Sequence, residues 1–154
     1  MKRSYLTNSL VPTIILVLLP TLVNNVYAGN ELVLVTGHDT QLEPLPPGQI
    51  RRAFLGLSVM QGSTRIIPIR NMSDDSLNGA FLQNTVFMSE KKYERYLVNR
   101  VFKSGGIRPK TVKAEKQLTQ ALQKPGTVSY MWKKEAESHP NVKIIQSLWQ
   151  NSAR

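Results

Sequence analysis

The chain has 154 residues, no cysteine, and 20 Lys and Arg side chains against 10 Asp and Glu, which gives a formal charge of +10. This length predicts one domain with a short extension, and the 41% of hydrophobic residues excludes a wholly disordered chain. The absence of cysteine excludes disulfides and thiolate zinc sites.

Residues 1–28 have the pattern of a secretory signal. Lys2 and Arg3 provide a positive start, Leu10 to Val23 form an apolar run, and Val26-Tyr27-Ala28 fits a cleavage site. The run has 14 residues and two prolines, whereas a membrane-spanning helix needs about 20 apolar residues. We therefore expect export to the periplasm, with no nucleic-acid partner and no stable membrane anchor after cleavage. An uncleaved anchor is the alternative.

The remaining chain stays strongly basic. Without Lys2 and Arg3 it has 18 Lys and Arg against 10 acidic side chains, a formal charge of +8. This surplus fits an anionic ligand, an anionic envelope surface or an acidic partner, and it fits a role in solubility equally well.

Apolar periodicity and turn residues predict alternating strands and helices over residues 29–150, followed by a frayed tail over 151–154. The predicted strands cover residues 31–36, 65–69, 127–132 and 141–145, and the predicted helices cover 47–55, 73–87, 89–103 and 114–122. The unbroken apolar run in the first strand predicts burial on both of its faces, and Pro68 restricts the second strand to a sheet edge or to its own end. This order predicts an α/β fold, with a small mixed sheet flanked by helices.

Four short motifs resemble those of phosphate-type periplasmic substrate-binding proteins. In chain order they are Ile50–Gly56 (IRRAFLG), Arg65–Phe81 (RIIPIRNMSDDSLNGAF), Tyr93–Pro109 (YERYLVNRVFKSGGIRP) and Lys124–Tyr130 (KPGTVSY). The resemblance implies one lobe of a type 2 periplasmic-binding fold, since two-lobed members need about twice this length. A single lobe leaves a bound anion largely hydrated, so the resemblance implies weak capture of phosphate or another small anion.

The resemblance also implies where an anion would bind. In this family the loop after the second strand contacts phosphate through an arginine and a Ser-Gly-Thr-like triplet. Here Asn71 falls at the arginine position, Arg70 precedes it, and the triplet falls on Asp75-Ser76-Leu77. Residues that follow the first strand are expected to line a crevice at the strand ends. The candidate anion-binding residues are therefore Thr36, His38, Arg70, Asn71, Ser73 and Ser76.

The acidic residues beside this loop favour a different interpretation. Asp74 and Asp75 gain roughly 0.3–1 kcal/mol from the first turn of a helix. The same carboxylates repel a nearby phosphate by about 1 kcal/mol in water, and by more when desolvated. Ser73, Asp74 and Asp75 are thus better explained as a helix start with Ser73 as N-cap than as an intact anion site. We expect a degenerate site.

Other candidates have ordinary structural explanations. Lys103 to Arg108 contain two glycines that suit an anion-binding loop, but a helix C-cap followed by a solvated loop explains them better. Five aromatic residues are predicted to lie in the core rather than on a binding face: Tyr93, Tyr96, Phe102, Trp132 and Trp149. His38 and His139 are too few and too far apart in the sequence to predict a metal site. No motif predicts catalytic residues or a cofactor.

Two functions remain open. The first is an exported, non-catalytic binding protein with a degenerate anion site, which serves a transporter or a sensor kinase. The second is an interaction protein that docks on an acidic sensor ectodomain or envelope partner without a small ligand. In the second, the docking surface would contain Lys91, Lys92, Arg95 and Lys103.

Overall fold

The computed structural model describes residues 30–151, so the expectations for residues 1–28 and 152–154 lie outside the described residues. The strands are β1 (Glu31–Gly37), β2 (Met60–Gln61), β3 (Thr64–Arg65), β4 (Ile67–Asn71), β5 (Lys110–Val112), β6 (Thr127–Trp132) and β7 (Val142–Gln150). The helices are α1 (Pro47–Phe54), α2 (Asp75–Phe81), the π-helical turn η1 (Leu82–Val86), α3 (Glu90–Ser104), α4 (Glu115–Leu122) and α5 (Lys133–Ser138).

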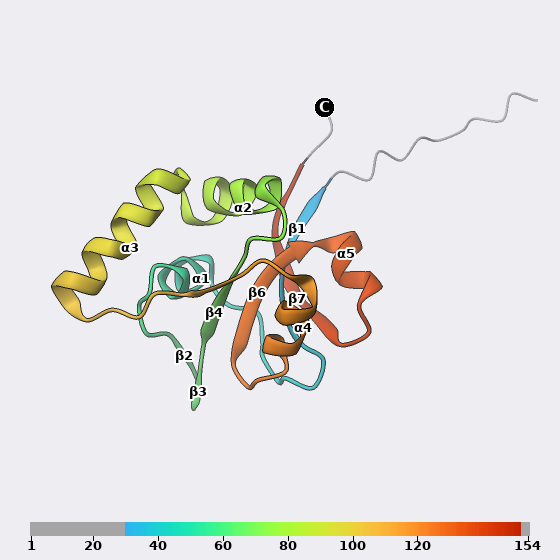
Figure 1. The fold of residues 1–154 in the computed structure, drawn as a ribbon. Helices are drawn as coiled ribbons and strands as arrows, with labels where there is room; N and C mark the ends of the chain where they lie inside the picture. Colours follow the sequence, from blue (N-terminus) through green and yellow to red (C-terminus); the bar gives the residue numbers. More distant parts are fainter. Residues whose placement is uncertain (1–29, 152–154) are drawn as a thin grey trace, which may run out of the picture.

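Five strands form one mixed sheet in the order β5-β4-β6-β1-β7. Figure 1 labels β4, β6, β1 and β7 of this sheet. β4 runs parallel to β5 and to β6, whereas β1 runs antiparallel to β6 and to β7. β2 and β3 form a separate hairpin. The predicted α/β fold with a small mixed sheet flanked by helices is confirmed.

Helices cover both faces of the sheet, and each face has its own apolar core. Leu32 and Leu34 of β1 pack into a core with α1, α2, η1 and α3, while Val33 and Val35 pack into a second core with α4 and α5. All four of these side chains are at most 1% exposed. The prediction that the first strand is buried on both faces is therefore confirmed.

A glycine and a proline lie at the boundaries of elements, as the sequence predicts. Gly56 has φ +75°, a left-handed conformation that closes α1, and its amide donates to the carbonyl of Ala53. Pro68 lies at the start of β4, where β6 pairs with it but β5 does not yet run alongside. The missing N–H of Pro68 therefore breaks no pairing with β5.

The structure also contains elements that the pattern did not predict. The β2–β3 hairpin, β5 and α5 are each six residues or fewer, too short to show a clear periodicity. The last strand extends to Gln150 rather than ending at Ile145, because all of β1 pairs with it. Asn151, predicted to fray, donates its amide to the carbonyl of Asn30 at 3.3 Å.

Among the helices within residues 30–151, none has the length and apolar character that crossing a bilayer requires.

Candidate functional site

Arg70 lies near the C-terminal end of β4, but its guanidinium is already engaged by the protein. The side chain is 3% exposed, it forms an ion pair with Glu94, and it lies 3.7 Å from a carboxylate oxygen of Glu90. The guanidinium carbon lies 4.8 Å from the centre of the Tyr93 ring, a cation–π contact. These contacts join β4 to α3, so Arg70 does not present a free clamp to an anion.

Asn71 and Ser73 bond to each other in the loop that follows β4. The Asn71 side chain donates to the carbonyl of Tyr130 at 3.1 Å, and its Oδ1 accepts from the amide and the hydroxyl of Ser73 at 3.0 and 2.6 Å. The Ser73 hydroxyl is thereby used inside the loop. The N-cap of α2 is Asp74, which corrects the prediction that Ser73 caps this helix.

The Asp74 carboxylate accepts the hydrogen bonds of the other donors near this loop, which belong to Ser76 and Trp132. It accepts hydrogen bonds from the Ser76 amide at 2.7 Å, the Ser76 hydroxyl at 3.1 Å and the Trp132 indole N–H at 3.0 Å. The indole bond is the largest of the effects that lower the pKa of Asp74 below its usual value, and the Ser76 donors lower it further. The Asp74 carboxylate thus uses the amide and the hydroxyl of Ser76, one of the predicted anion-binding residues.

Thr36 and His38 lie at the opposite end of the sheet from this loop. β1 runs antiparallel to β6, so the C-terminal end of β1 meets the beginning of β6, where the buried Thr36 hydroxyl donates to the carbonyl of Thr127 at 2.7 Å. The exposed His38 follows in the turn after β1. Thr36 and His38 therefore do not share one anion site with Arg70, Asn71, Ser73 and Ser76, because β1 runs opposite to β4 in the sheet.

The segment from Lys103 to Arg108 contains the end of α3, as the helix C-cap interpretation predicts. Gly105 has φ +59° and its amide donates to the carbonyl of Val101, which makes it the C-cap of α3. Arg108 forms an ion pair with Glu94.

Of the five aromatic residues predicted to lie in the core, Phe102 departs most from the prediction, since it is 86% exposed.

An apolar cavity of about 290 Å³ lies beside the first half of β4, where β5 has not yet begun. Three cationic side chains, Arg65, Arg108 and Lys110, contribute to its lining. The other lining residues are Ala53, Gly56, Leu57, Ile66, Ile67, Pro68, Ile107 and Pro109. None of the six candidate anion-binding residues lines this cavity.

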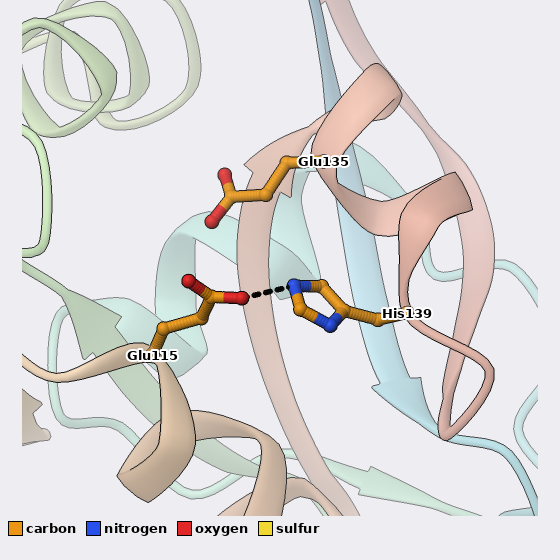
Figure 2. A group of neighbouring side chains, drawn as sticks. All are labelled: Glu115, Glu135 and His139. Atoms are coloured by element: carbon orange, nitrogen blue, oxygen red, sulfur yellow. Dashed lines mark ion pairs between the residues drawn. The ribbon is translucent and has the colours of Figure 1, made fainter.

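A second group of polar side chains was missed by sequence reasoning. Glu115 at the start of α4, Glu135 on α5 and His139 just after α5 point toward one another (Figure 2). His139 Nε2 lies 2.5 Å from a Glu115 carboxylate oxygen, and one nitrogen or oxygen from each residue lies within 4.8 Å of the others. Two carboxylates and an imidazole are a ligand set that a divalent metal ion accepts.

This group lies near Asp74, on the side of the sheet where β4 and β6 end. Burial raises the pKa of Glu135, the neighbouring carboxylates of Glu115 and Asp74 raise it further, and His139 opposes them. The carboxylates of Glu115, Glu135 and Asp74 therefore lie close enough for their charges to influence one another. The four-residue spacing of Glu135 and His139 was a signal in the sequence, but nothing in it pointed to Glu115.

Comparison with known proteins shows the fold. No family model matches the amino-acid sequence, and the search of curated proteins found no match. A solved structure, an ABC-type phosphate transport receptor from Vibrio cholerae, is similar with a TM-score of 0.55 over 77% of this chain, at 11% sequence identity. The alignment covers 46% of that receptor, so this chain spans about half of its length. The likeness supports the fold of one lobe of such a receptor.

Proposed function

We propose that this chain is an exported, non-catalytic binding protein built on one lobe of a phosphate-receptor fold, with an anion site that its own carboxylate fills. The observation that carries this proposal is the set of three hydrogen bonds that Asp74 accepts from Ser76 and Trp132. Phosphate or another small anion would bind weakly at most, and the partner would be a transporter or a sensor kinase.

The hydrogen-bond donors at the start of α2 are already used by the protein itself. A phosphate at the start of α2 would have to displace the Asp74 carboxylate, because both groups need the same amide and hydroxyl of Ser76. Two like charges 4 Å apart repel by about 1 kcal/mol in water and by more in a less polar site. Arg70 offers no compensation, since its guanidinium is buried against Glu94.

Calorimetry and chemical rescue test this proposal. We expect phosphate, sulfate and acetate at millimolar concentration to give the wild type no heat beyond dilution. In Asp74→Ala the freed donors accept an external anion, so phosphate or acetate should raise the melting temperature more than chloride at equal ionic strength. Saturable phosphate binding by the wild type, with no difference in Asp74→Ala, would overturn the proposal.

Export is tested separately by fractionating cells that express the full chain. We expect the protein in the periplasmic fraction, with a mass that lacks residues 1–28. A full-length mass in the membrane fraction would favour the uncleaved anchor.

One observation favours the second candidate function, docking on an acidic partner. The outer surface of α3 combines exposed apolar side chains with cations. Phe102 is 86% exposed, and Val98 and Val101 are 42% and 41% exposed. Four exposed cations lie on the same helix: Lys91, Lys92, Arg95 and Lys103. Aromatic residues and Arg are enriched at protein interfaces. Exposed cations also attract an acidic partner, and this attraction weakens in salt.

Salt dependence and substitution test this alternative. Capture of an acidic sensor ectodomain or envelope partner should weaken as ionic strength rises. It should also weaken in the double variant Lys91→Glu/Arg95→Glu but not in Lys116→Glu, which removes a cation from α4 instead. Capture that is insensitive to salt and to the α3 variant would exclude this function.

A further inference from the structure

We propose that Glu115, Glu135 and His139 form a binding site for a divalent transition-metal ion, best suited to Zn²⁺ (Figure 2). This metal site is separate from the proposed anion site, because none of its three residues takes part in the hydrogen bonds around Asp74.

The three ligand atoms are already close to the spacing that zinc requires. Zinc binds imidazole nitrogen at about 2.0–2.1 Å and carboxylate oxygen at about 2.0–2.2 Å, which places ligand atoms about 3.4 Å apart in a tetrahedral site. Here they lie within 4.8 Å of one another, with one pair at 2.5 Å. The Glu115 side chain is 53% exposed, so a rotation about its own bonds can adjust this spacing.

The ligands come from positions that the fold holds in place. Buried Leu118 and Leu122 anchor α4 in the second core, and buried Ala136 anchors α5 in the same core. The His139 amide donates to the carbonyl of Ala136, and the carbonyl of His139 accepts from the Val142 amide at the start of β7. The backbone therefore presents the imidazole to the two carboxylates before any ion binds, which lowers the cost of binding.

The charge of the surroundings also favours a cation. Lys and Arg outnumber acids two to one in this chain. Within residues 30–151, however, neither Glu115 nor Glu135 forms an ion pair with a Lys or Arg. His139 pairs with Glu115, and among the described residues Glu135 forms no ion pair. A divalent ion would neutralise both carboxylates at once.

The chemistry of the ligands selects the metal. One imidazole with two carboxylates is a mixed set of nitrogen and oxygen ligands. Such a set suits Zn²⁺ better than it suits Ca²⁺ and Mg²⁺, which prefer oxygen ligands alone. The absence of cysteine removes the thiolates that Cu⁺ prefers. Three protein ligands leave a fourth zinc position for water or for an external ligand.

Zinc titration of the full chain tests the site. After treatment with a chelator and removal of that chelator, the wild type should bind Zn²⁺ at a single saturable site and should show a tetrahedral absorption spectrum with Co²⁺. His139→Gln and Glu135→Gln should each weaken zinc binding by at least about tenfold. Circular dichroism establishes that each variant is folded, and should either not fold, Glu115→Gln is used in its place.

Two matched controls locate the ion. Glu137→Gln removes a neighbouring carboxylate on α5, and His38→Gln removes the other imidazole of the chain; both should bind zinc as the wild type does. No saturable zinc binding, or equal loss in the controls, would overturn the site. That result would leave the proposal for Asp74 intact, because the titration contains no phosphate and every variant keeps Asp74, Ser76 and Trp132.

Discussion

The indole N–H of Trp132 donates a hydrogen bond to the Asp74 carboxylate at 3.0 Å and so joins the end of β6 to the loop after β4. The same carboxylate caps α2 through the amide of Ser76. One side chain thus performs two structural tasks at the carboxyl ends of β4 and β6.

Asp74→Ala should lower the free energy of unfolding by about 1 kcal/mol, because an N-cap substitution of this kind costs roughly 0.5–2 kcal/mol. Asp74→Asn is the matched control, since an Asn side chain keeps an oxygen that accepts from the Ser76 amide. Urea denaturation of both variants measures the difference. Equal losses in the two variants would show that the charge of Asp74, rather than its role as a cap, supplies the stability.

The same carboxylate should make stability depend on acid. Its pKa is lowered in the folded protein, chiefly by the Trp132 indole, so the folded state favours the ionised form relative to the unfolded chain. This stabilisation is complete well above the ordinary value of 3.8 and is lost as the pH falls below that value through the folded pKa. The stability of the wild type should therefore fall toward that of Asp74→Asn in this range, as measured by urea denaturation at each pH. A constant difference between the two proteins would contradict this assignment.

Local patterns predicted the elements well, because they depend on residues that are close in the sequence. The apolar run Leu32 to Val35 predicts a buried strand whatever its neighbours are. Its direction in the sheet depends on β6 and β7, about a hundred residues later, and a buried run looks the same in either direction. Thr36 and His38 were misplaced for this reason.

The difference between contacts that are local in the sequence and contacts that are distant also explains which parts of the candidate sites were predicted. The helix start around Asp74 was recognised because capping is local. The engagement of Arg70 was not recognised, since its partner Glu94 lies 24 residues away on α3. The cluster of Glu115 and His139 likewise depends on α4 and α5 packing side by side on one face of the sheet. Neither relationship leaves a periodic signal in the sequence.

Glu94→Ala should destabilise the protein more than Glu90→Ala does. Glu94 is the close ion-pair partner of a 3% exposed guanidinium, whereas Glu90 is 56% exposed and lies 3.7 Å from it. We expect a loss of roughly 1–3 kcal/mol for Glu94→Ala and less than about 1 kcal/mol for Glu90→Ala, because only the first leaves a buried charge poorly paired. Chemical denaturation measures both. Equal effects would mean that Glu90 moves in to replace Glu94.

Gly126 should be far less tolerant of substitution than Gly62, although both have a positive φ, +75° and +57°. A Cβ at Gly126 would lie 2.1 Å from the carbonyl oxygen of Arg65, whereas a Cβ at Gly62 meets no atom within 4 Å. Gly62→Ala should therefore lower the free energy of unfolding by about 1–2 kcal/mol, which is the cost of holding a residue with a Cβ in the left-handed conformation. Gly126→Ala should add roughly 1–3 kcal/mol, because the start of β6 must move away from β3. Thermal unfolding compares the two variants, and similar melting temperatures would show that the backbone at Gly126 relaxes without loss of packing.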